Sequence, residues 1–304
     1  MSFCTCGKRG DLTFPLSVQF FCIECFSKKF ERRFLRNIPR SVRGHSIVIA
    51  FSGGKDSSTL LYILNKYRKK LKIPVLSVIT LDEENPMTQE SRNKIIDISR
   101  ERYPNVTFIQ FSYSELFGFS LPKLVLQSDR KKLRFTPCTI CGVLRRHAIL
   151  QLALEIDADY IAMGNTLNDE AATMFLNILR AKPEKNIRNE VTYNTANGRQ
   201  LPNRIKPLAR FFEETIRSYC AINEIQPVKT NCSYENRSLR FDINSFLLTL
   251  EEKDPNLLYN IVSSGRKFKI NNTKSNIVMK CQNCNSYSTH HECSACSLVR
   301  KIMS

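Results

Sequence analysis

Short apolar runs alternate with amphipathic stretches along the middle of the chain. The first run, residues 47–51, is rich in β-branched side chains, as is typical of a parallel strand covered on both faces. A glycine turn follows, and beyond it Leu60, Leu61 and Leu64 share one face of a predicted helix. Strand, turn and helix in this order predict a βα unit.

The alternation continues toward the C-terminus. It predicts strands at 73–81, 106–111 and 158–164, and helices near 88–102, 141–156, 167–180, 211–223 and 238–253. Residues 182–204, which are rich in Asn and Arg, are predicted to form a surface loop. Such alternation implies an α/β fold with a doubly wound parallel sheet, which binds its ligand at the carboxyl ends of the strands.

Length and composition place the chain among globular proteins. Its 304 residues, 42% of them hydrophobic, predict one main domain with smaller attachments. The sequence contains no run of 18 apolar residues that would suggest a membrane span, so no membrane partner is expected. The first ten residues lack the apolar core of a secretory signal, which predicts a cytoplasmic location.

The charge is strongly unbalanced. The formal net charge is +18, from 46 Lys and Arg against 28 Asp and Glu, which indicates a polyanionic partner, with nucleic acid as the first candidate. A run of charged residues usually marks a solvated helix face, but the basic run before the first predicted strand contains only one acidic residue, Glu31. The cations of the two basic runs are Lys28, Lys29, Arg32, Arg33, Arg36, Arg40 and Arg43, and Arg130, Lys131, Lys132 and Arg134.

The turn after the first strand reads SGGKDS, at residues 52–57. Two glycines let the backbone approach a ligand closely, and the helix that follows offers unpaired N–H groups to an anion. It is not a Walker A loop, because Ile49 and Asp56 stand where that pattern needs Gly and Ser or Thr. A plain glycine turn would not need Asp56 and two flanking hydroxyls. The stretch resembles the pyrophosphate loop of the ATP pyrophosphatase families, which cleave ATP between its α and β phosphates and adenylate a substrate.

Twelve cysteines in a reducing compartment indicate metal sites rather than disulfides. The last four form two CxxC knuckles, which have the spacing of a structural zinc site. The alternative is that two CxxC motifs occur together by chance. Zinc is also predicted for the first four, although the single residue between Cys4 and Cys6 strains binding to one ion, so that one ligand could be replaced. The two sets are Cys4, Cys6, Cys22 and Cys25, and Cys281, Cys284, Cys293 and Cys296.

These patterns predict three parts. Residues 1–44 would form a cysteine-rich zinc module and a basic linker, residues 45–270 an ATP pyrophosphatase-type catalytic domain, and residues 271–304 a C-terminal zinc ribbon.

Several longer stretches resemble the cytoplasmic tRNA 2-thiolation protein 1 family, which is related to the two-thiouridine synthetases. They are CIECFSKKFE, SGGKDS, CTICGVLRRHAI, GNTLNDEAATMFLNILR and CSYENRSLRFDINSFLLTLEEKDP, followed by the closing cysteine ribbon. The resemblance implies thiolation of the wobble uridine, U34, in tRNAs for Lys, Glu and Gln. ATP would adenylate O2 of the uridine with loss of pyrophosphate, and a sulfur nucleophile would then attack C2 and displace AMP.

Each step of this chemistry has candidate residues. The pyrophosphate would be held by Ser52, Gly53, Gly54, Asp56 and Ser57, with Lys55 supplying charge near the α-phosphate. Asp169 opens the helix after the fourth strand, where it would hold Mg²⁺ or act on the uridine, unless it is an ordinary acid favoured by the helix dipole. Asp82, with Thr80 and Leu81, would contact adenosine, and Gly164 ends the fourth strand at the same crevice.

The core cysteines would handle sulfur. Cys138 and Cys141 lie at a helix start, where the dipole favours the thiolate. Cys220 lies in an amphipathic helix, where burial is the commoner fate of a cysteine. Cys232 lies in a polar loop and matches the third active-site cysteine of the family. We therefore expect Cys138, Cys141 and Cys232 to bind a [4Fe-4S] cluster with one iron open, the alternative being a persulfide relay without iron.

The resemblance also implies partners: tRNA, a ubiquitin-like sulfur carrier protein, and either a second thiolation subunit or a second copy of the chain. Three positions depart from the family pattern. Asn165 stands where His is usual and Glu84 where Gly is usual. Arg145 replaces the Lys of bacterial relatives, which favours charge stabilisation over proton transfer, because Arg stays protonated.

Two kinds of alternative remain. One is another ATP pyrophosphatase-type tRNA enzyme, although a cytidine thiolase pairs two CxxC motifs in its core and a lysidine synthetase needs no catalytic cysteine. The other is a catalytically inactive RNA-binding subunit of the thiolation complex, against which the intact SGGKDS and CTIC stretches argue.

Overall fold

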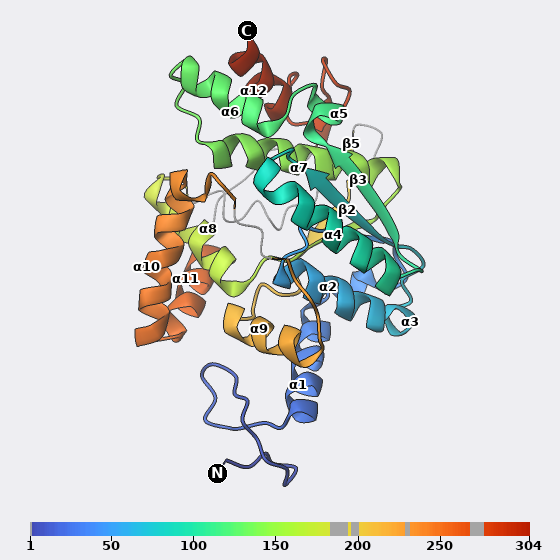
Figure 1. The fold of residues 1–304 in the computed structure, drawn as a ribbon, viewed down its shortest axis with the longest axis vertical. Coiled ribbons are helices and arrows are strands. Elements are labelled where there is room, and N and C mark those ends of the chain that lie inside the picture. The colour runs from blue at the N-terminus through green and yellow to red at the C-terminus, as the bar shows by residue number, and fades with distance from the viewer. Residues whose placement is uncertain (1, 183–193, 196–200, 229–231, 268–276) are drawn as a thin grey trace.

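The computed structural model describes residues 2–182, 194–195, 201–228, 232–267 and 277–304. At its centre lies a five-stranded sheet in which every pairing is parallel, in the order β3-β2-β1-β4-β6 (Figure 1). The strands are β1 Ile47–Ala50, β2 Leu76–Asp82, β3 Thr107–Ser112, β4 Tyr160–Met163 and β6 Asn203–Ile205. The predicted doubly wound sheet is confirmed, and its order reverses between β1 and β4, which opens a crevice at their carboxyl ends.

Alternate side chains of β1 enter different cores. Ile47 and Ile49 pack with helices α1, α2, α4 and α9, whereas Val48 packs with α6, α7 and α12 on the opposite face. The helices on the first face are α1 Ile23–Asn37, α2 Lys55–Lys66, α4 Pro86–Arg102 and α9 Glu213–Ile222, and those on the second are α6 Leu121–Arg130, α7 Pro137–Glu155 and α12 Ser294–Met303. Both faces of the sheet are therefore covered, as the apolar runs predict.

A third cluster lies beside the sheet. Helix α8 (Leu167–Leu179) packs there with α10 (Leu239–Lys253) and α11 (Asn256–Lys267). Gly265 of α11 lets the helices approach closely, since a Cβ there would lie 2.5 Å from the sulfur of Met174. None of the helices that the structure describes is both long and apolar enough to cross a membrane.

The two termini lie at opposite ends of the molecule (Figure 1). The N-terminal segment packs on α1, and the C-terminal segment packs through α12 against α6 and α7. A small second sheet joins β5 Asn194–Thr195, β7 Ile277–Lys280 and β8 Tyr287–Ser288. Short elements complete the fold: α3 Arg68–Leu71 and α5 Tyr113–Phe117, with 3-10 turns at Arg40–Val42 and Glu235–Arg237.

Some elements differ from the sequence prediction. The basic linker before the first strand contains helix α1. The predicted surface loop at 182–204 lies partly outside the described residues, and its end forms β6, which is too short and polar to show a strand pattern. Helices α6 and α11 were not predicted. Helix α7 begins at Pro137 rather than Cys141, because Thr136 caps it by accepting from the Thr139 amide.

Candidate active site

The pyrophosphate loop (residues 52–57) connects β1 to α2. Gly53 has φ +79°, and a Cβ there would lie 2.6 Å from the Cγ2 of Ile95 in α4. A Cβ at Gly164, just beyond β4, would lie 3.1 Å from the Ser57 amide nitrogen. The loop thus lies between α4 and the end of β4; glycine is needed at position 53, and position 164 leaves little space for a side chain.

Hydrogen bonds hold the loop from behind. The carbonyl of Gly53 accepts from the Ser58 hydroxyl at 3.3 Å and from the Val228 amide at 3.0 Å. Ser52 and Ser57 share a hydroxyl–hydroxyl bond of 3.2 Å. With its carbonyl anchored, the loop leads directly into the N-terminal turn of α2, whose first N–H groups have no partner within the helix and favour an anion.

Four charged side chains meet beside the loop. Lys55 Nζ lies 3.1 Å from Asp56 Oδ2 and 3.0 Å from Glu213 Oε2. Burial raises the pKa of Asp56 to about 6, although Lys55 opposes this, and Glu213 and Asp169 add to the rise. Asp56 Oδ1 is buried and has no hydrogen-bond partner among the described residues. A carboxylate oxygen left unpaired in this way is a suitable ligand for a hard cation such as Mg²⁺.

Asp169 is both a helix cap and a wall of the site. Its Oδ2 accepts from the Thr166 amide at 3.0 Å, and the Thr166 hydroxyl accepts from the Asp169 amide at 3.2 Å, which completes a capping box at the start of α8. Burial raises the pKa of Asp169. The residue also lines the cavity described next, so both sequence interpretations of Asp169 describe part of its setting.

A cavity of about 650 Å³ joins the pyrophosphate loop to the core cysteines. Of the site residues predicted from the sequence, it is lined by Ser52, Asp56, Ser57, Cys141, Gly164, Asp169 and Cys232. The predicted site residues that do not line it include Gly53, Gly54, Lys55, Asp82 and Cys138. Lys55 turns toward Glu213, and the Asp82 carboxylate accepts from Arg92 Nη1 at 3.0 Å and from the Glu84 amide at 2.8 Å.

The sulfur of Cys141 lies in a polar setting. Arg145 Nη2 is 3.3 Å from it, and the Tyr113 hydroxyl is 3.5 Å from it. Burial raises the pKa of Cys232, and the neighbouring thiols of Cys141 and Cys138 raise it further. Cys220 lies apart from this group, buried with its thiol 3.2 Å from the Ile225 carbonyl, which agrees with the predicted core role.

The spacing of these sulfurs differs from that of the terminal sets. In each terminal set the four ligand sulfurs all lie within 4.8 Å of one another, Cys4 and Cys6 included. That spacing suits one tetrahedral zinc ion. Among the described residues, the sulfurs of Cys138, Cys141 and Cys232 do not all lie within 4.8 Å of one another. In a cluster each cysteine binds a different iron, and the sulfurs stand farther apart.

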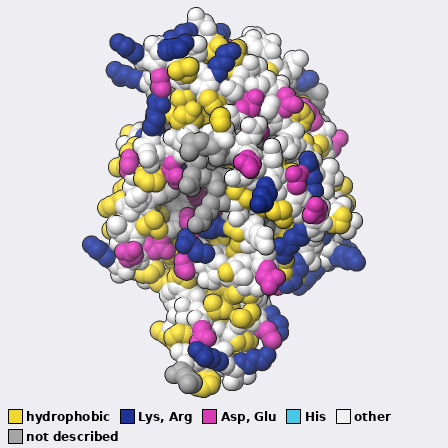
Figure 2. All heavy atoms as spheres, in the orientation of Figure 1, with side chains coloured by type: hydrophobic (Ala, Val, Ile, Leu, Met, Phe, Trp, Pro, Cys, Tyr) yellow, Lys and Arg dark blue, Asp and Glu magenta, His cyan; other side chains and the backbone are white. Residues whose placement is uncertain are grey.

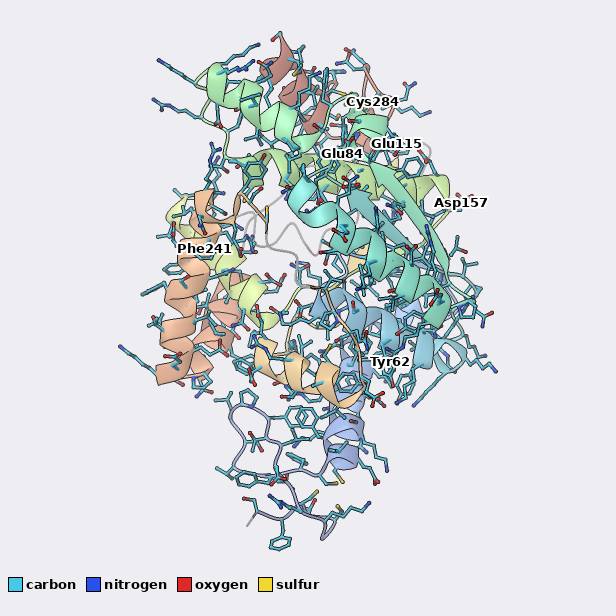
Figure 3. The ribbon with its side chains drawn as sticks, in the orientation of Figure 1. Tyr62, Glu84, Glu115, Asp157, Phe241 and Cys284 are labelled. Carbon is cyan, nitrogen blue, oxygen red and sulfur yellow. The ribbon has the colours of Figure 1, made fainter. Side chains whose placement is uncertain are left out.

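Each terminal set is held by its surroundings. Hydrogen bonds from the Cys6 and Cys22 amides lower the pKa of Cys4 to about 6, which favours the thiolate that zinc binds. At the other end, Cys284 (labelled in Figure 3) lies with its sulfur 3.9 Å from Nε2 of His147 in α7. The C-terminal cysteines therefore sit against the same helix that carries Cys138 and Cys141.

Glu84 occupies the position where glycine is usual, and it adopts φ +55°. A left-handed conformation is strained for a residue with a side chain. The side chain offsets part of this strain, because Glu84 Oε2 accepts from the Ser114 amide at 2.8 Å in the first turn of α5. Figure 3 shows Glu84 near Glu115 of that helix.

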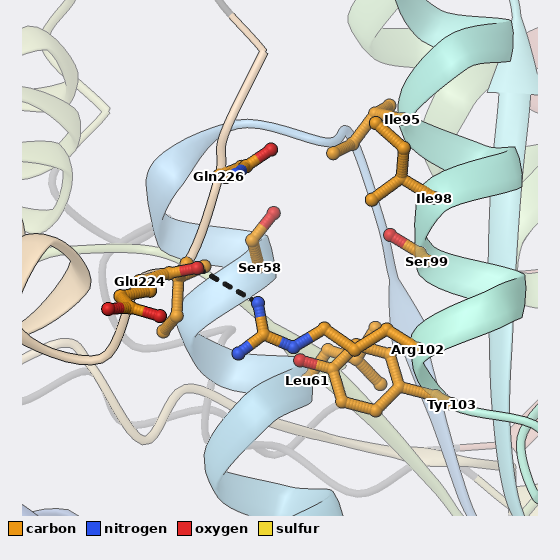
Figure 4. Close-up of a pocket in the computed structure, with 10 residues that line it drawn as sticks. Ser58, Leu61, Ile95, Ile98, Ser99, Arg102, Tyr103, Glu224 and Gln226 are labelled. Carbon is orange, nitrogen blue, oxygen red and sulfur yellow. Dashed lines mark hydrogen bonds between the residues drawn. The ribbon is translucent and has the colours of Figure 1, made fainter.

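A second, smaller cavity of about 280 Å³ lies behind the loop (Figure 4). Its walls are α2, α4 and the segment after α9, where Arg102 Nη1 donates to the Glu224 carbonyl at 3.0 Å. Ser58 and Ile95 belong both to these walls and to the contacts of Gly53.

Residues 26–110 match the PP-loop domain family. This match, the parallel sheet and the geometry of residues 52–57 confirm the predicted ATP pyrophosphatase-type fold.

The similarity extends well beyond that domain. Cytoplasmic tRNA 2-thiolation protein 1 of Drosophila mojavensis is 29% identical over 302 residues, which cover 98% of this chain and 86% of the relative. The protein of the same name from Drosophila melanogaster has the same identity and coverage. The structure of the U34-tRNA thiolase NcsA from Methanococcus maripaludis, with its [4Fe-4S] cluster, superposes with a TM-score of 0.81 at 25% identity, over 99% of this chain and 96% of that one. The family resemblance predicted from the sequence is confirmed along nearly the whole chain.

Proposed function

We propose that this chain is an ATP-dependent tRNA sulfurtransferase that thiolates the wobble uridine U34 at C2. The observation that carries the proposal is the single cavity that joins the pyrophosphate loop to Cys141 and Cys232. A thiolase needs its activated uridine within reach of both an adenylating group and a sulfur donor, and this cavity offers both. The whole-length similarity to tRNA 2-thiolation proteins and to a U34-tRNA thiolase supports it.

In the first step, uridine O2 attacks the α-phosphorus of ATP, and pyrophosphate leaves with the electron pair of the broken P–O bond. Residues 52–57 would hold the departing pyrophosphate at the N-terminus of α2. Asp56, with its unpaired Oδ1, and Asp169 would bind Mg²⁺, which neutralises phosphate charge when present. Lys55 would contribute charge near the α-phosphate once ATP competes with Glu213 for its ammonium group.

In the second step, a sulfur nucleophile attacks C2, and AMP leaves with the original O2 of the uridine. Cys138, Cys141 and Cys232 would hold a [4Fe-4S] cluster with one open iron, which would supply sulfide chemistry at the cavity wall. The matched structure of the U34-tRNA thiolase NcsA contains a [4Fe-4S] cluster. A persulfide on Cys138 or Cys141 is the alternative sulfur source.

Two structural zinc ions would occupy the terminal cysteine sets, whose sulfurs already have the required spacing. The module boundaries predicted from the sequence, at residues 44 and 270, enclose these sets and leave the PP-loop sheet between them. The cysteine sets would shape the ends of the molecule and have no part in the reaction.

The tRNA would lie on the basic surfaces. Lys28, Arg32 and Arg36 are exposed and follow one another at helical spacing on α1. The acid of this run, Glu31, is buried, where it accepts from Lys66 at 2.6 Å and from the Tyr67 and Tyr219 hydroxyls. Within the run from Lys28 to Arg36, the exposed charged side chains are therefore all basic. Figure 2 shows a second group of Lys and Arg at the end of the molecule that carries α6.

The other partners and the location follow the sequence predictions. We propose a cytoplasmic protein, as the names of its relatives state for them. We further propose that sulfur comes from a ubiquitin-like carrier protein and that a second thiolation subunit or a second copy of the chain joins the complex. An inactive RNA-binding subunit is disfavoured by the complete cradle around Gly53 and Asp56.

The function is tested by expressing the chain in a strain that lacks its own wobble-uridine thiolase and analysing its tRNA nucleosides by mass spectrometry. Restored 2-thiouridine at position 34 supports the proposal. In a strain that also lacks its cytidine thiolase, newly formed 2-thiocytidine identifies a cytidine thiolase instead. No thiolated nucleoside, with the sulfur carrier and the second subunit co-expressed, identifies an inactive subunit. The control is Asp56→Ala, which is expected to remain in the soluble fraction but to restore nothing.

A further inference from the structure

The carboxylate of Glu83 lies beside the cavity and has no part in the reaction described so far. It follows β2, its residue is only 6% exposed, and its side chain lines the cavity. It forms ion pairs with two guanidinium groups, those of Arg92 and Arg145. A buried carboxylate held by two arginines from different helices is costly to build without a function for it.

One of these arginines, Arg92, connects Glu83 to Asp82 and to helix α4. Arg92, on α4, is 7% exposed and donates from Nη1 to Asp82 Oδ1 at 3.0 Å while it also contacts Glu83. Asp82 is in turn held by the Glu84 amide at 2.8 Å and by Gln89 Nε2 at 3.2 Å. Glu83 is therefore attached to the end of β2 and to α4, two parts of the rigid sheet layer.

The other arginine, Arg145, contacts the sulfur of Cys141. A single nitrogen of Arg145, Nη2, contacts both Glu83 Oε1 and Cys141 Sγ, the latter at 3.3 Å. Arg145 follows Cys141 by one helical turn on α7, and 48% of its side chain is exposed. Helical spacing alone would leave so exposed a guanidinium free to take other rotamers, so the ion pair with Glu83 is what holds it over the sulfur.

We propose that Glu83 is a positioning residue for sulfur transfer, which holds the Arg145 guanidinium against the sulfur of Cys141. Arg92 and Asp82 support Glu83, and the charges alternate from Asp82 through Arg92 and Glu83 to Arg145. A guanidinium held there donates to negative charge on that sulfur or on atoms bound to it. Its Nη2 is then engaged by Glu83 and Cys141. This inference rests on the proposed thiolase function.

The test uses full-length, metal-loaded protein and compares Glu83→Gln with Glu84→Gln. Glu84 is the adjacent acid, but it faces the Ser114 amide, from which a glutamine oxygen can also accept. Glu83→Gln is expected to slow single-turnover thiolation by about 10- to 100-fold. ATP–pyrophosphate exchange and the Kd for tRNA should change less than twofold, and Glu84→Gln should change none of the three.

A second readout reports the position of the arginine directly. Phenylglyoxal modification of Arg145, followed by peptide mass spectrometry, is expected to be several-fold faster in Glu83→Gln than in the parent chain or Glu84→Gln. Equal rates in all three chains would overturn the inference, whatever the activities.

A double-mutant cycle separates positioning from a general structural effect. Because Glu83 acts through Arg145, Glu83→Gln should slow thiolation in the parent chain and have no further effect in an Arg145→Ala background. Additive losses, or a tRNA Kd weakened tenfold by Arg145→Ala, would refute the proposed role. Failure of the proposed function is distinguishable, because the parent chain itself would then give no thiolated tRNA.

Discussion

Replacing Asp56 by Asn should stabilise the protein while it removes the activity. Burial raises the pKa of Asp56 from 3.8 to about 6, and its side chain is 25% exposed. Because the pKa of the folded state exceeds that of the unfolded state, the stability contributed by this group is present in full below its unfolded pKa. It is lost as the pH rises through about 6.

The size of the effect follows from the two pKa values. At pH 7.5 the ionised carboxylate costs the fold about 3 kcal/mol relative to a neutral side chain of the same shape. Asp56→Asn should therefore raise the free energy of unfolding by up to about 3 kcal/mol at pH 7.5, and by only about half as much at pH 5, where the folded parent chain holds a proton on Asp56.

Urea denaturation of both chains at pH 7.5 and pH 5 measures this difference, with the slopes compared to ensure that the same surface unfolds. Asp97→Asn, on the exposed side of α4, is the control and should change stability little. Pyrophosphate release should be abolished by Asp56→Asn and by Asp56→Ala, with tRNA affinity nearly unchanged, because phosphate contacts elsewhere dominate binding. The explanation that burial raises the pKa of Asp56 would be contradicted if the Asn variant were no more stable at pH 7.5. It would also be contradicted if the stability difference between the two chains did not narrow at pH 5.

Three further predictions concern other parts of the molecule. Replacing Cys281 and Cys284 together by Ser should cost one zinc per chain by elemental analysis, whereas Cys220→Ser should cost none; unchanged zinc in the first variant refutes the ribbon site. Gly53→Ala should destabilise the fold by more than Gly44→Ala in thermal unfolding, because both residues have positive φ but only at Gly53 would the new Cβ lie 2.6 Å from Ile95 Cγ2. Equal losses of stability would show that the contact is unimportant. Replacing Arg32 and Arg36 together by Ala should weaken tRNA binding and reduce the slope of log K against log salt by about 1 to 2, whereas Arg217→Ala on α9 should leave both unchanged. An unchanged slope in the double variant argues against α1 as the tRNA surface.

The sequence by itself determined the features that depend on residues close together in the chain. The strand before residue 52, the glycine turn and the helix after it follow from side-chain period and backbone freedom, and the structure places them as predicted. The two cysteine sets likewise follow from spacing, since a short segment with four thiols has few ways to fold except around a metal.

Only the tertiary structure decided which distant residues meet. Glu213 reaches Lys55 across 158 positions, and Glu83 reaches Arg145 across 62, and neither acid carries a local pattern that marks it. Periodicity reports which face of an element is apolar, but it does not report which element covers that face. The burial of Glu31, which leaves only basic charges exposed between Lys28 and Arg36, also depends on α2 and α9 packing against α1. The charges around the reacting atoms are therefore set by long-range packing, whereas the loop and the two terminal cysteine sets follow from the sequence.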